Sequence, residues 1–361
     1  MQKQTYFLIG LLLLVAACRK PSTPGDPAAG SLYFPPVTGT AWETRPPASL
    51  GWNEVQLNNL NSFLQTKNTK AFIVLKNGRI VVERYFGTFT ADSNWYWASA
   101  GKTATALLVG IAQQEGLLRL SDRTSQYLGT GWTSLPPAKE QLITVAHQLS
   151  MTTGLDNAVP DDDCTLPSCL QYRADAGTRW FYHNAPYTLL EKVVEQASGK
   201  TYNQYFQEKV RNRIGMNGLW LRTGPYNNVY YSNARSMARF GLLLLARGNW
   251  AGTPILSDTG YFNSMIRSSQ SLNLSYGYLT WLNGKASHML PLTSLVFNGM
   301  LTPNAPADLY AALGKNDQKI YVVPSQQLVV IRMGESAGNV QLAVSSFDNE
   351  LWGQLRPLIG Y

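Results

Sequence analysis

Apolar residues in the first part of the chain recur with two different spacings. From Val55 to Leu64 they fall at helical spacing, which predicts an amphipathic helix. Two strand-like runs follow, AFIVLK and RIVVERYF, on either side of Asn77-Gly78. An Asn-Gly pair between such runs is the strongest short signal for a β-hairpin. The pattern therefore predicts a helix followed by two antiparallel strands.

The strand pattern stops after this hairpin and returns only near the C-terminus. Helical and loop-like patterns extend from Ser99 to about Arg247. Strand patterns return at 308–313, 319–324 and 327–333, and a helical pattern follows from about Val340 to Leu355. A sheet assembled from both ends of a chain, with helices between them, is typical of α+β folds. We expect a sheet part at about 48–98 and 290–361 and a helical part at about 99–289.

The first residues have the pattern of an export signal. Lys3 precedes an apolar run from Tyr6 to Leu14, and Val15-Ala16-Ala17-Cys18 follows. The run is too short to span a bilayer. Its ending resembles a bacterial lipobox, so we expect residues 1–17 to be a signal peptide and Cys18 to carry a lipid anchor. Ordinary cleavage without lipid and a retained anchor are the alternatives.

The segment after Cys18 has the composition of a flexible tether. Residues 19–47 contain seven prolines among Gly, Ser and Thr, a composition typical of an extended linker. We therefore expect a lipidated tether at 18–47 and a folded domain at 48–361, held at the membrane of the cell envelope. The net charge of +8 is spread without basic runs, which indicates anionic envelope surfaces rather than nucleic acid as a partner.

The two remaining cysteines are close in sequence. Cys164 and Cys169 lie on either side of Pro167, and in an oxidising compartment we expect them to form a disulfide. A metal site is the weaker alternative, because the three histidines are not at ligand spacing. The acidic run Asp161-Asp162-Asp163 is more typical of a solvated loop than of a calcium site. We expect no metal.

Ser99 and Lys102 place a hydroxyl and an amine at the start of an apolar segment that runs to about Glu115. If the segment is helical, positions three apart share a face and the amine reaches the hydroxyl. A neutral amine at hydrogen-bond distance can take the hydroxyl proton and so activate a nucleophile. Burial beneath the aromatic residues 95–97 and the helix dipole would both favour the neutral amine. Ser-x-x-Lys also occurs by chance, so its context has to decide.

That context resembles a known superfamily. The run WYWASAGKTATALLVGIAQQEGLLRLSDRTSQYLG, with HQLSMTTGLD further on, is similar to the serine β-lactamases and penicillin-binding proteins. The resemblance extends from about Trp52 to Met333 and is closest to the class C-related branch of esterases and nylon-oligomer-type hydrolases. It implies an antiparallel sheet flanked by helices, packed on an all-helical sub-domain. It also implies that Ser99 is the nucleophile and Lys102 its base.

The second motif of this branch is Tyr-x-Asn, and four copies begin at Tyr182, Tyr226, Tyr231 and Tyr261. Only the first resembles the family in context, GTRWFYHNAPYTLLEKVVEQASGK, and in its spacing from Ser99. The other three are better explained as a turn, a helix cap and a short helix. The resemblance therefore implies that Tyr182 is catalytic and that Asn184 orients Lys102 or binds the substrate's amide.

The third motif, Lys-Thr-Gly or His-Thr-Gly on a strand, has no literal copy. Gly314-Lys315-Asn316-Asp317 takes its place by context. The backbone N–H of Lys315 or Asn316 can still hold an oxyanion opposite the Ser99 amide. In the family, the hydroxyl of this motif binds the carboxylate of the substrate. That hydroxyl is missing here, and the Lys315 ammonium is the group that can replace it. The alternative for Lys315 is a solvated lysine in a turn.

Together these motifs imply a serine hydrolase that acts on a small ester or amide through an acyl-enzyme, with no cofactor. Trp95, Trp97 and Trp180 are expected to line an apolar cleft. A β-lactamase or D-Ala-D-Ala carboxypeptidase is the first alternative, and a non-catalytic sensor of β-lactams or peptidoglycan fragments is the second. An α/β-hydrolase is excluded because Ser99 lacks the Gly-x-Ser-x-Gly elbow.

Overall fold

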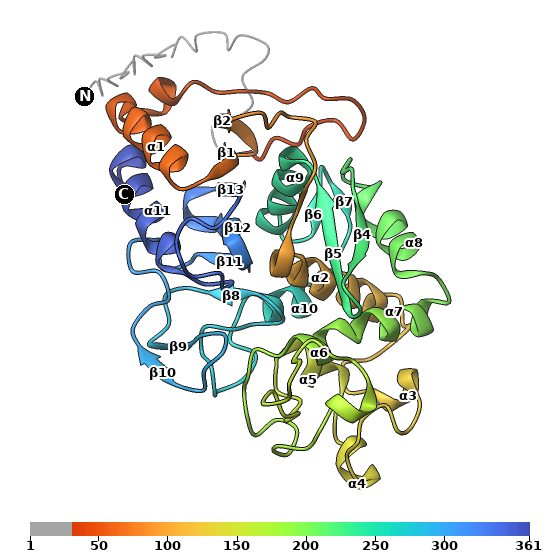
Figure 1. Ribbon diagram of the computed structural model, residues 1–361. Helices are drawn as coiled ribbons and strands as arrows, with labels where there is room; N and C mark the ends of the chain where they lie inside the picture. Colours follow the sequence, from red (N-terminus) through yellow and green to blue (C-terminus); the bar gives the residue numbers. More distant parts are fainter. Residues whose placement is uncertain (1–30) are drawn as a thin grey trace, which may run out of the picture. The chain divides into compact units, whose positions relative to one another are not determined.

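The computed structural model describes residues 31–361 (Figure 1). The expected signal peptide, Cys18 and the first part of the expected tether lie outside this range. Within 31–361, no helix combines the length and the apolar character that crossing a membrane would need.

The main sheet has six antiparallel strands in the order β2-β1-β13-β12-β11-β8 (Figure 1). Pairing of β1 with β13, with Val74 opposite Val330, joins the two ends of the chain as the sequence predicts. The edge strand β8 comes from the segment expected to be helical. The strands are β1 (Thr69–Lys76), β2 (Arg79–Tyr85), β8 (Trp281–Leu282), β11 (Tyr310–Gly314), β12 (Gln318–Val323) and β13 (Leu328–Gly334).

The predicted hairpin is confirmed. Asn77 and Gly78 have φ values of 50° and 80°, as the two central residues of a type I′ turn require. A side chain at Gly78 would also collide with the backbone, because its Cβ would lie 1.9 Å from the Tyr33 carbonyl oxygen. The segment that contains Tyr33 therefore crosses directly over the turn.

Part of the expected tether packs along this hairpin. The Trp42 indole N–H donates to the Gly78 carbonyl at 2.8 Å, and the Arg45 amide donates to the Ile80 carbonyl at 2.8 Å. The compact unit thus begins at Leu32.

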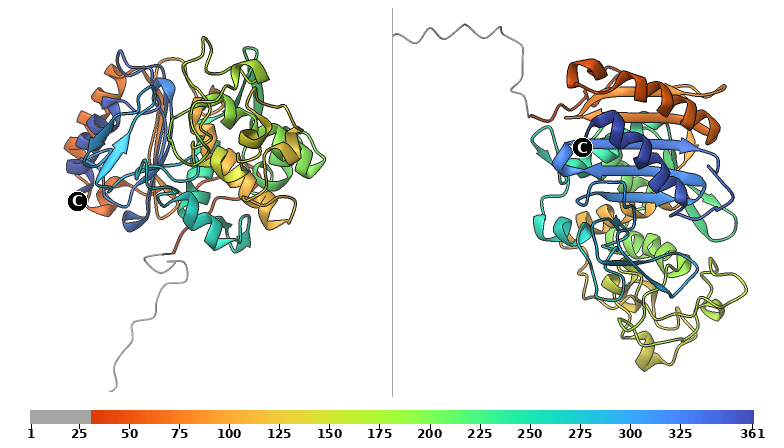
Figure 2. Two further views of the ribbon diagram at one scale, coloured as in Figure 1. Left: turned by 90° about the horizontal axis from the view of Figure 1, so that it is seen from below. Right: turned by 90° about the vertical axis from the view of Figure 1, so that its left-hand side faces the viewer.

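Two terminal helices cover one face of the main sheet, α1 (Glu54–Thr66) and α11 (Ser346–Ile359) (Figure 2). They pack together through stacked rings of Phe63 and Phe347, whose centroids are 5.9 Å apart. The last helix begins later than the predicted Val340, because Ser345 and Asp348 form a capping box that fixes its start. It also continues past the predicted Leu355.

The other face of the sheet carries α9 (Ala234–Leu245), which packs on β1, β12 and β13, and α2 (Gly101–Gln114), which contacts β11. Helix α2 is buried from Gly101 to Ala112, which makes it the central helix of the fold. Gly241 on α9 lets the helix approach the sheet, since an added Cβ would lie 2.5 Å from the Val329 side chain.

The region between α2 and β8 is mainly helical but also carries strands. Trp220 is buried, whereas Leu219 and Leu221 on either side of it are exposed. This alternation of buried and exposed side chains is typical of a β-strand. The helices are α3 (Ser125–Leu128), α4 (Pro137–Glu140), α5 (Val145–Leu149), α6 (Asn184–Thr188), α7 (Leu190–Ser198), α8 (Tyr202–Phe206) and α10 (Thr259–Met265). A three-stranded sheet, β3-β5-β4, joins β3 (Trp95–Tyr96), β5 (Asn227–Ser232) and β4 (Leu219–Thr223). Two short pairs complete the fold, β6 (Asn249–Trp250) with β7 (Thr253–Pro254), and β9 (Ser287–Met289) with β10 (Val296–Asn298).

Candidate active site

Ser99 lies in a short 3-10 turn, Ala98–Ala100, that leads directly into α2. The turn is anchored by Trp97, whose side chain is fully buried. Its indole N–H donates to the Ser232 hydroxyl at 2.8 Å, and its amide donates to the Tyr230 carbonyl at 2.8 Å. Ser99 is thereby held at the amino end of the central helix.

Strand β11 ends against this turn. A Cβ on Gly314, the last residue of β11, would lie 2.5 Å from the Trp97 carbonyl oxygen and 3.1 Å from the Ser99 nitrogen. Because these neighbours are backbone atoms, they cannot move aside as a side chain could. Glycine at position 314 therefore permits the approach that brings Lys315 beside Ser99.

Lys102 is the polar centre of the site. Its Nζ lies 3.2 Å from Ser99 Oγ and donates to Asn184 Oδ1 at 2.8 Å, while its side chain is only 4% exposed. Burial lowers the pKa of Lys102 to about 7, although the carboxylates of Asp162 and Asp163 oppose the shift. A substantial fraction of the amine is therefore neutral near pH 7, and it can accept the proton of the Ser99 hydroxyl.

Tyr182 lies beside this pair just before α6. Its ring stacks on Trp281 at a centroid distance of 5.6 Å, and Lys102 Nζ is 5.2 Å from the ring centroid. Burial raises the pKa of Tyr182 well above its usual value, and the neighbouring Ser99 hydroxyl opposes part of that rise. The Tyr182 hydroxyl is buried and makes no hydrogen bond with another atom of residues 31–361.

The other Tyr-x-Asn copies have different surroundings. Asn233 caps α9 by accepting a hydrogen bond from the Ser236 amide at 2.8 Å. Tyr261 donates to the Ala106 carbonyl in the core at 2.7 Å. Tyr226 lies in the turn between β4 and β5. These three positions match the cap, the short helix and the turn that the sequence predicts.

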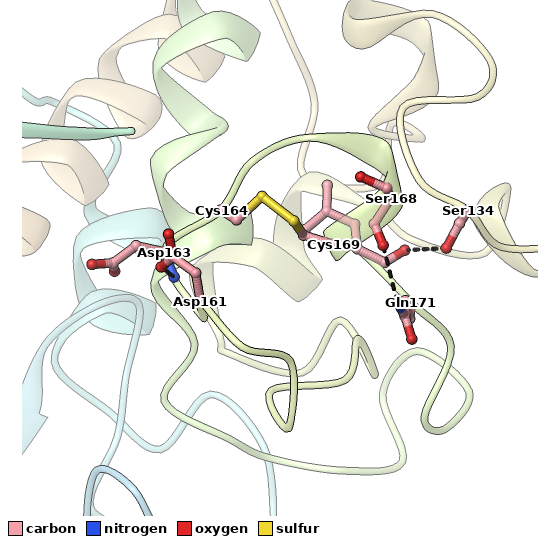
Figure 3. The surroundings of a disulfide bond; sticks show 8 residues. Ser134, Asp161, Asp163, Cys164, Ser168, Cys169 and Gln171 are labelled. Atoms are coloured by element: carbon pink, nitrogen blue, oxygen red, sulfur yellow. Dashed lines mark hydrogen bonds between the residues drawn. A yellow bond between two sulfur atoms is a disulfide. The ribbon is translucent and has the colours of Figure 1, made fainter. Parts of the chain in front are cut away.

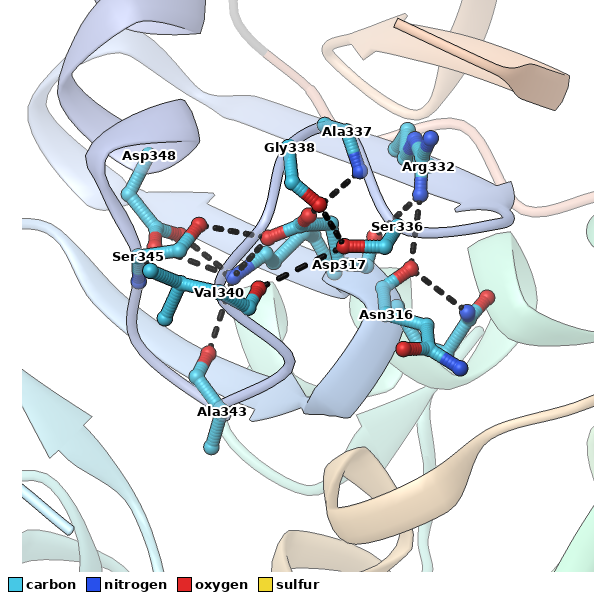
Figure 4. A network of polar contacts seen from close by, with 12 residues as sticks. Asn316, Asp317, Arg332, Ser336, Ala337, Gly338, Val340, Ala343, Ser345 and Asp348 are labelled. Carbon is cyan, nitrogen blue, oxygen red and sulfur yellow. Dashed lines mark hydrogen bonds and ion pairs between the residues drawn. The ribbon is translucent and has the colours of Figure 1, made fainter.

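The turn after β11 has an unusual backbone. Asn316 and Asp317 have φ values of 56° and 58°. These values lie in the left-handed region, which is unfavourable for most residues other than glycine. Fully buried Arg332 stabilises it by donating to the carbonyls of Asn316 and Asp317 at 2.9 and 3.0 Å (Figure 4). Lys315, which precedes them, is exposed and faces the pocket.

A second group of buried contacts holds the Asp317 carboxylate. It accepts hydrogen bonds from the Ser345 hydroxyl at 2.6 Å and the Ala337 amide at 2.9 Å, and it pairs with Lys319 at 3.2 Å (Figure 4). Lys319 also pairs with Asp348 of α11 at 2.9 Å. The buried charges are thus compensated, and the turn is connected to the last helix.

Ser99 and Lys102 open into a pocket of about 300 Å³. Its walls are mostly polar and aromatic: Tyr96, Ala98, Ser99, Lys102, Asp163, Asn184, Tyr187, Thr223, Asn227, Asn228, Val229, Tyr231 and Lys315. The expectation that Trp95, Trp97 and Trp180 line the cleft is wrong. Trp97 and Trp180 are at most 1% exposed because they pack in the core, and Trp95 packs outside the pocket against Phe89.

Sequence reasoning missed the tyrosines that form the wall. Tyr187 lies three residues after Asn184 on α6, and its ring centroid is 4.0 Å from Lys102 Nζ. The helical i, i+3 relation to Asn184 is the signal that could have identified it. Tyr96 and Tyr231 face each other across β3 and β5, a pairing that local sequence does not reveal.

Asp163 was also missed as a pocket residue. It directly precedes Cys164, which forms a disulfide with Cys169 (Figure 3). The Asp163 carboxylate accepts a hydrogen bond from the side-chain amide of Asn227 on β5 at 2.8 Å. One carboxylate oxygen from each of Asp161, Asp162 and Asp163 lies within 4.8 Å of the other two. Asp163 belongs to the pocket, whereas Asp161 is exposed.

The sequence profile described as Beta-lactamase matches residues 65–348, which is most of the chain. The chain belongs to the beta-lactamase family. Relatives include a beta-lactamase of Escherichia coli K12, 28% identical over 37% of this chain and 36% of that protein. The PbpX penicillin-binding protein assigned in Bacillus subtilis is 25% identical over 40% of this chain and 39% of the relative. The chain thus matches little more than a third of the length of these two relatives.

Solved structures share the fold of this chain. A Bacillus anthracis protein assigned as a 6-aminohexanoate-dimer hydrolase has a TM-score of 0.67 at 17% identity, over 90% of this chain and 89% of its own. A Mycobacterium bovis beta-lactamase has a TM-score of 0.58 at 18% identity, over 83% of this chain and 98% of its own. The α+β architecture of a β-lactamase and penicillin-binding-protein hydrolase is therefore shown.

Proposed function

We propose that this beta-lactamase-family protein is a serine hydrolase that cleaves a small ester or amide through an acyl-enzyme on Ser99. The observation that carries the proposal is the 3.2 Å contact between Ser99 Oγ and the buried amine of Lys102, whose pKa is lowered to about 7. A neutral amine in that position removes the hydroxyl proton as Ser99 Oγ attacks the carbonyl carbon.

The neighbouring groups supply the rest of the reaction. Ser99 and Lys315 both line the pocket, and in this proposal their backbone N–H groups stabilise the oxyanion of the tetrahedral intermediate. Asn184 holds the Lys102 amine in place. Tyr182 passes the proton to the leaving group, which breaks the ester or amide bond and leaves the acyl group on Ser99. Water then hydrolyses the acyl-enzyme and restores the serine.

Two other functions on the same site remain as candidates. Family membership favours a β-lactamase or a D-Ala-D-Ala carboxypeptidase, and steady turnover of nitrocefin would identify the former. A non-catalytic sensor would bind such compounds without turnover. The described site itself favours hydrolysis, because a sensor has no need of a base with a lowered pKa beside the serine.

The test is to trap the acyl-enzyme. Incubation with an activated p-nitrophenyl ester, followed by peptide mass spectrometry, should place one acyl group on the peptide that contains Ser99. Ser99→Ala should abolish the adduct, and Lys102→Ala should remove most of it. The double variant should be scarcely worse than either single one, because the two residues act as a unit. Lys192→Ala removes an exposed lysine outside the pocket and is the matched control. Normal turnover by Ser99→Ala would refute the proposal.

We further propose that the protein is an envelope lipoprotein anchored through Cys18. The supporting feature is the sequence Val15-Ala16-Ala17-Cys18 after a short apolar run. The Cys18→Ala variant should leave the membrane fraction or stay unprocessed. Wild-type protein that is soluble and carries no lipid by mass spectrometry would contradict this.

A further inference from the structure

The Tyr182 hydroxyl, which passes the proton in the proposed reaction, is not held in place by hydrogen bonds of its own. It makes none with another atom of residues 31–361. Tyr182 belongs to the helical part of the fold, just before α6, whereas Ser99 lies where the start of α2 meets the end of β11. A misplacement of about 1 Å in such a group can cost about 10²-fold in rate. Contacts of the Tyr182 ring therefore have to hold the hydroxyl in place.

The Trp281 indole makes the broadest of these contacts. It stacks on the Tyr182 ring, with the centroids 5.6 Å apart and an angle of 23° between the planes. Tyr276 adds an edge-to-face contact with Tyr182 at 6.2 Å and packs on Trp281 at 4.8 Å. A β-bridge between Tyr276 and Trp281 closes the turn 276–281. All three side chains are buried, and close packing leaves rings of this size little room to shift independently.

Trp281 is fixed from the side of the main sheet. It lies in β8 and pairs with Ala311 of β11. Three residues further along β11 comes Gly314, where an added Cβ would lie 3.1 Å from the Ser99 nitrogen. The same strand therefore holds both the indole that stacks on Tyr182 and the turn that carries Ser99.

The turn 276–281 is strained and is anchored to the active-site helix. Leu279 has a φ of 48°, in the left-handed region that is unfavourable for residues other than glycine. Its carbonyl accepts a hydrogen bond from the buried Thr103 hydroxyl at 2.8 Å, and its amide donates to the Leu149 carbonyl at 2.9 Å. Thr103 directly follows Lys102 on α2. Strain of this kind persists only where the surrounding contacts enforce it, and it is concentrated at functional sites.

We propose that the turn 276–281 positions the proton relay, with Trp281 as the positioning residue for Tyr182. This inference rests on the proposed function and adds a part of the site that lies outside its sequence motifs. The stacked indole sets the tilt of the Tyr182 ring relative to the Ser99 hydroxyl. The Thr103 hydrogen bond fixes the turn that carries the indole. Trp281 acts through the Tyr182 ring and not through contact with the substrate.

The first test uses two leaving groups that differ in their need for a proton. The purified full chain is assayed with p-nitrophenyl acetate, whose nitrophenolate leaves without a proton, and with 4-nitroacetanilide, whose amine takes one up. Trp281→Leu should lower kcat/KM for the anilide about tenfold or more and that for the ester much less. Trp281→Phe keeps an aromatic face for the Tyr182 ring and should restore most of the activity. Equal losses for the two compounds, or no loss for the anilide, would overturn the inference.

A double-mutant cycle separates positioning from general support of the fold. In the Tyr182→Phe background the hydroxyl is already missing, so Trp281→Leu should lower kcat/KM for the anilide by less than about twofold. The same loss in both backgrounds would argue against positioning. Trp352→Leu is the matched control. It removes an equally buried indole from α11, which covers the opposite face of the main sheet, and should leave kcat/KM of the folded protein near that of wild type.

Thr103→Val keeps the proposal testable if Trp281→Leu does not fold. Valine has the shape of threonine but cannot donate to the Leu279 carbonyl, so kcat/KM for the anilide should fall. The loss should again disappear in the Tyr182→Phe background. No loss, or a loss of the same size in both backgrounds, would overturn the role of the turn.

Crystal structures distinguish failure of this inference from failure of the proposed function. The orientation of the Tyr182 ring is compared between wild type and the Trp281→Leu and Thr103→Val variants. A ring that moves relative to Lys102 supports positioning even if wild type hydrolyses neither compound, and the proposed hydrolysis is then what fails. A ring that keeps its place in both variants would overturn the inference even if wild type is an active hydrolase.

Discussion

Replacing Lys102 by methionine should stabilise the protein at neutral pH while abolishing its activity. The amine has a pKa of about 7 in the folded protein and about 10.5 when exposed. Between these values the unfolded chain binds a proton that the folded protein excludes, so the wild-type free energy of unfolding rises with pH. The proton-linked cost of Lys102 is about 4 kcal/mol at pH 7 and about 1 kcal/mol at pH 9.5.

The variant removes this cost but also loses two hydrogen bonds, to Ser99 and Asn184, worth about 1 kcal/mol each. Lys102→Met should therefore be about 2 kcal/mol more stable than wild type at pH 7 and slightly less stable at pH 9.5. Urea unfolding at both pH values measures the difference. Ser99→Ala retains the amine, so its stability should change with pH as that of wild type does. A Lys102→Met effect of the same size at both pH values would refute the lowered pKa.

Three further changes test the architecture of the site. Tyr182→Phe should reduce hydrolysis about 10²-fold because the proton relay is lost. Tyr226→Phe, in the turn between β4 and β5 and not itself in the pocket wall, should leave hydrolysis near normal in the same assay. Oxidised, denatured protein should contain no free thiol at Cys164 or Cys169, and alkylation followed by mass spectrometry would expose one. Gly314→Ala should lower the free energy of unfolding by about 1–3 kcal/mol, because the added Cβ collides with backbone atoms. An unchanged midpoint of urea unfolding would contradict the close contact between β11 and the Ser99 turn.

Local signals were sufficient where neighbours in sequence are also neighbours in space. The Asn77-Gly78 hairpin follows from turn chemistry, and the 3.2 Å contact of Ser99 with Lys102 follows from helical spacing. The cap at Asn233 is equally local. Each of these features depends on a few consecutive residues, so the pattern of residue types determines it.

Features that depend on distant partners were missed. From the sequence alone, Asp163 is interpreted as part of a solvated acidic loop. In the structure its carboxylate lies in the pocket, where it accepts a hydrogen bond from Asn227, 64 residues later. Trp97 and Trp180 were expected in the cleft because large aromatic residues suit both a core and a pocket wall. Their partners in the core are distant in sequence, and residue type alone does not distinguish the two environments.

The buried charges around Asp317 link the site to the end of the chain. During synthesis Ser99 and Lys102 emerge long before Ser345 and Asp348. Until those residues arrive, the Asp317 carboxylate lacks its Ser345 partner and Lys319 lacks its Asp348 partner. A chain that ends before Ser345 would therefore carry the proposed nucleophile without the buried contacts that hold this wall of the pocket in place.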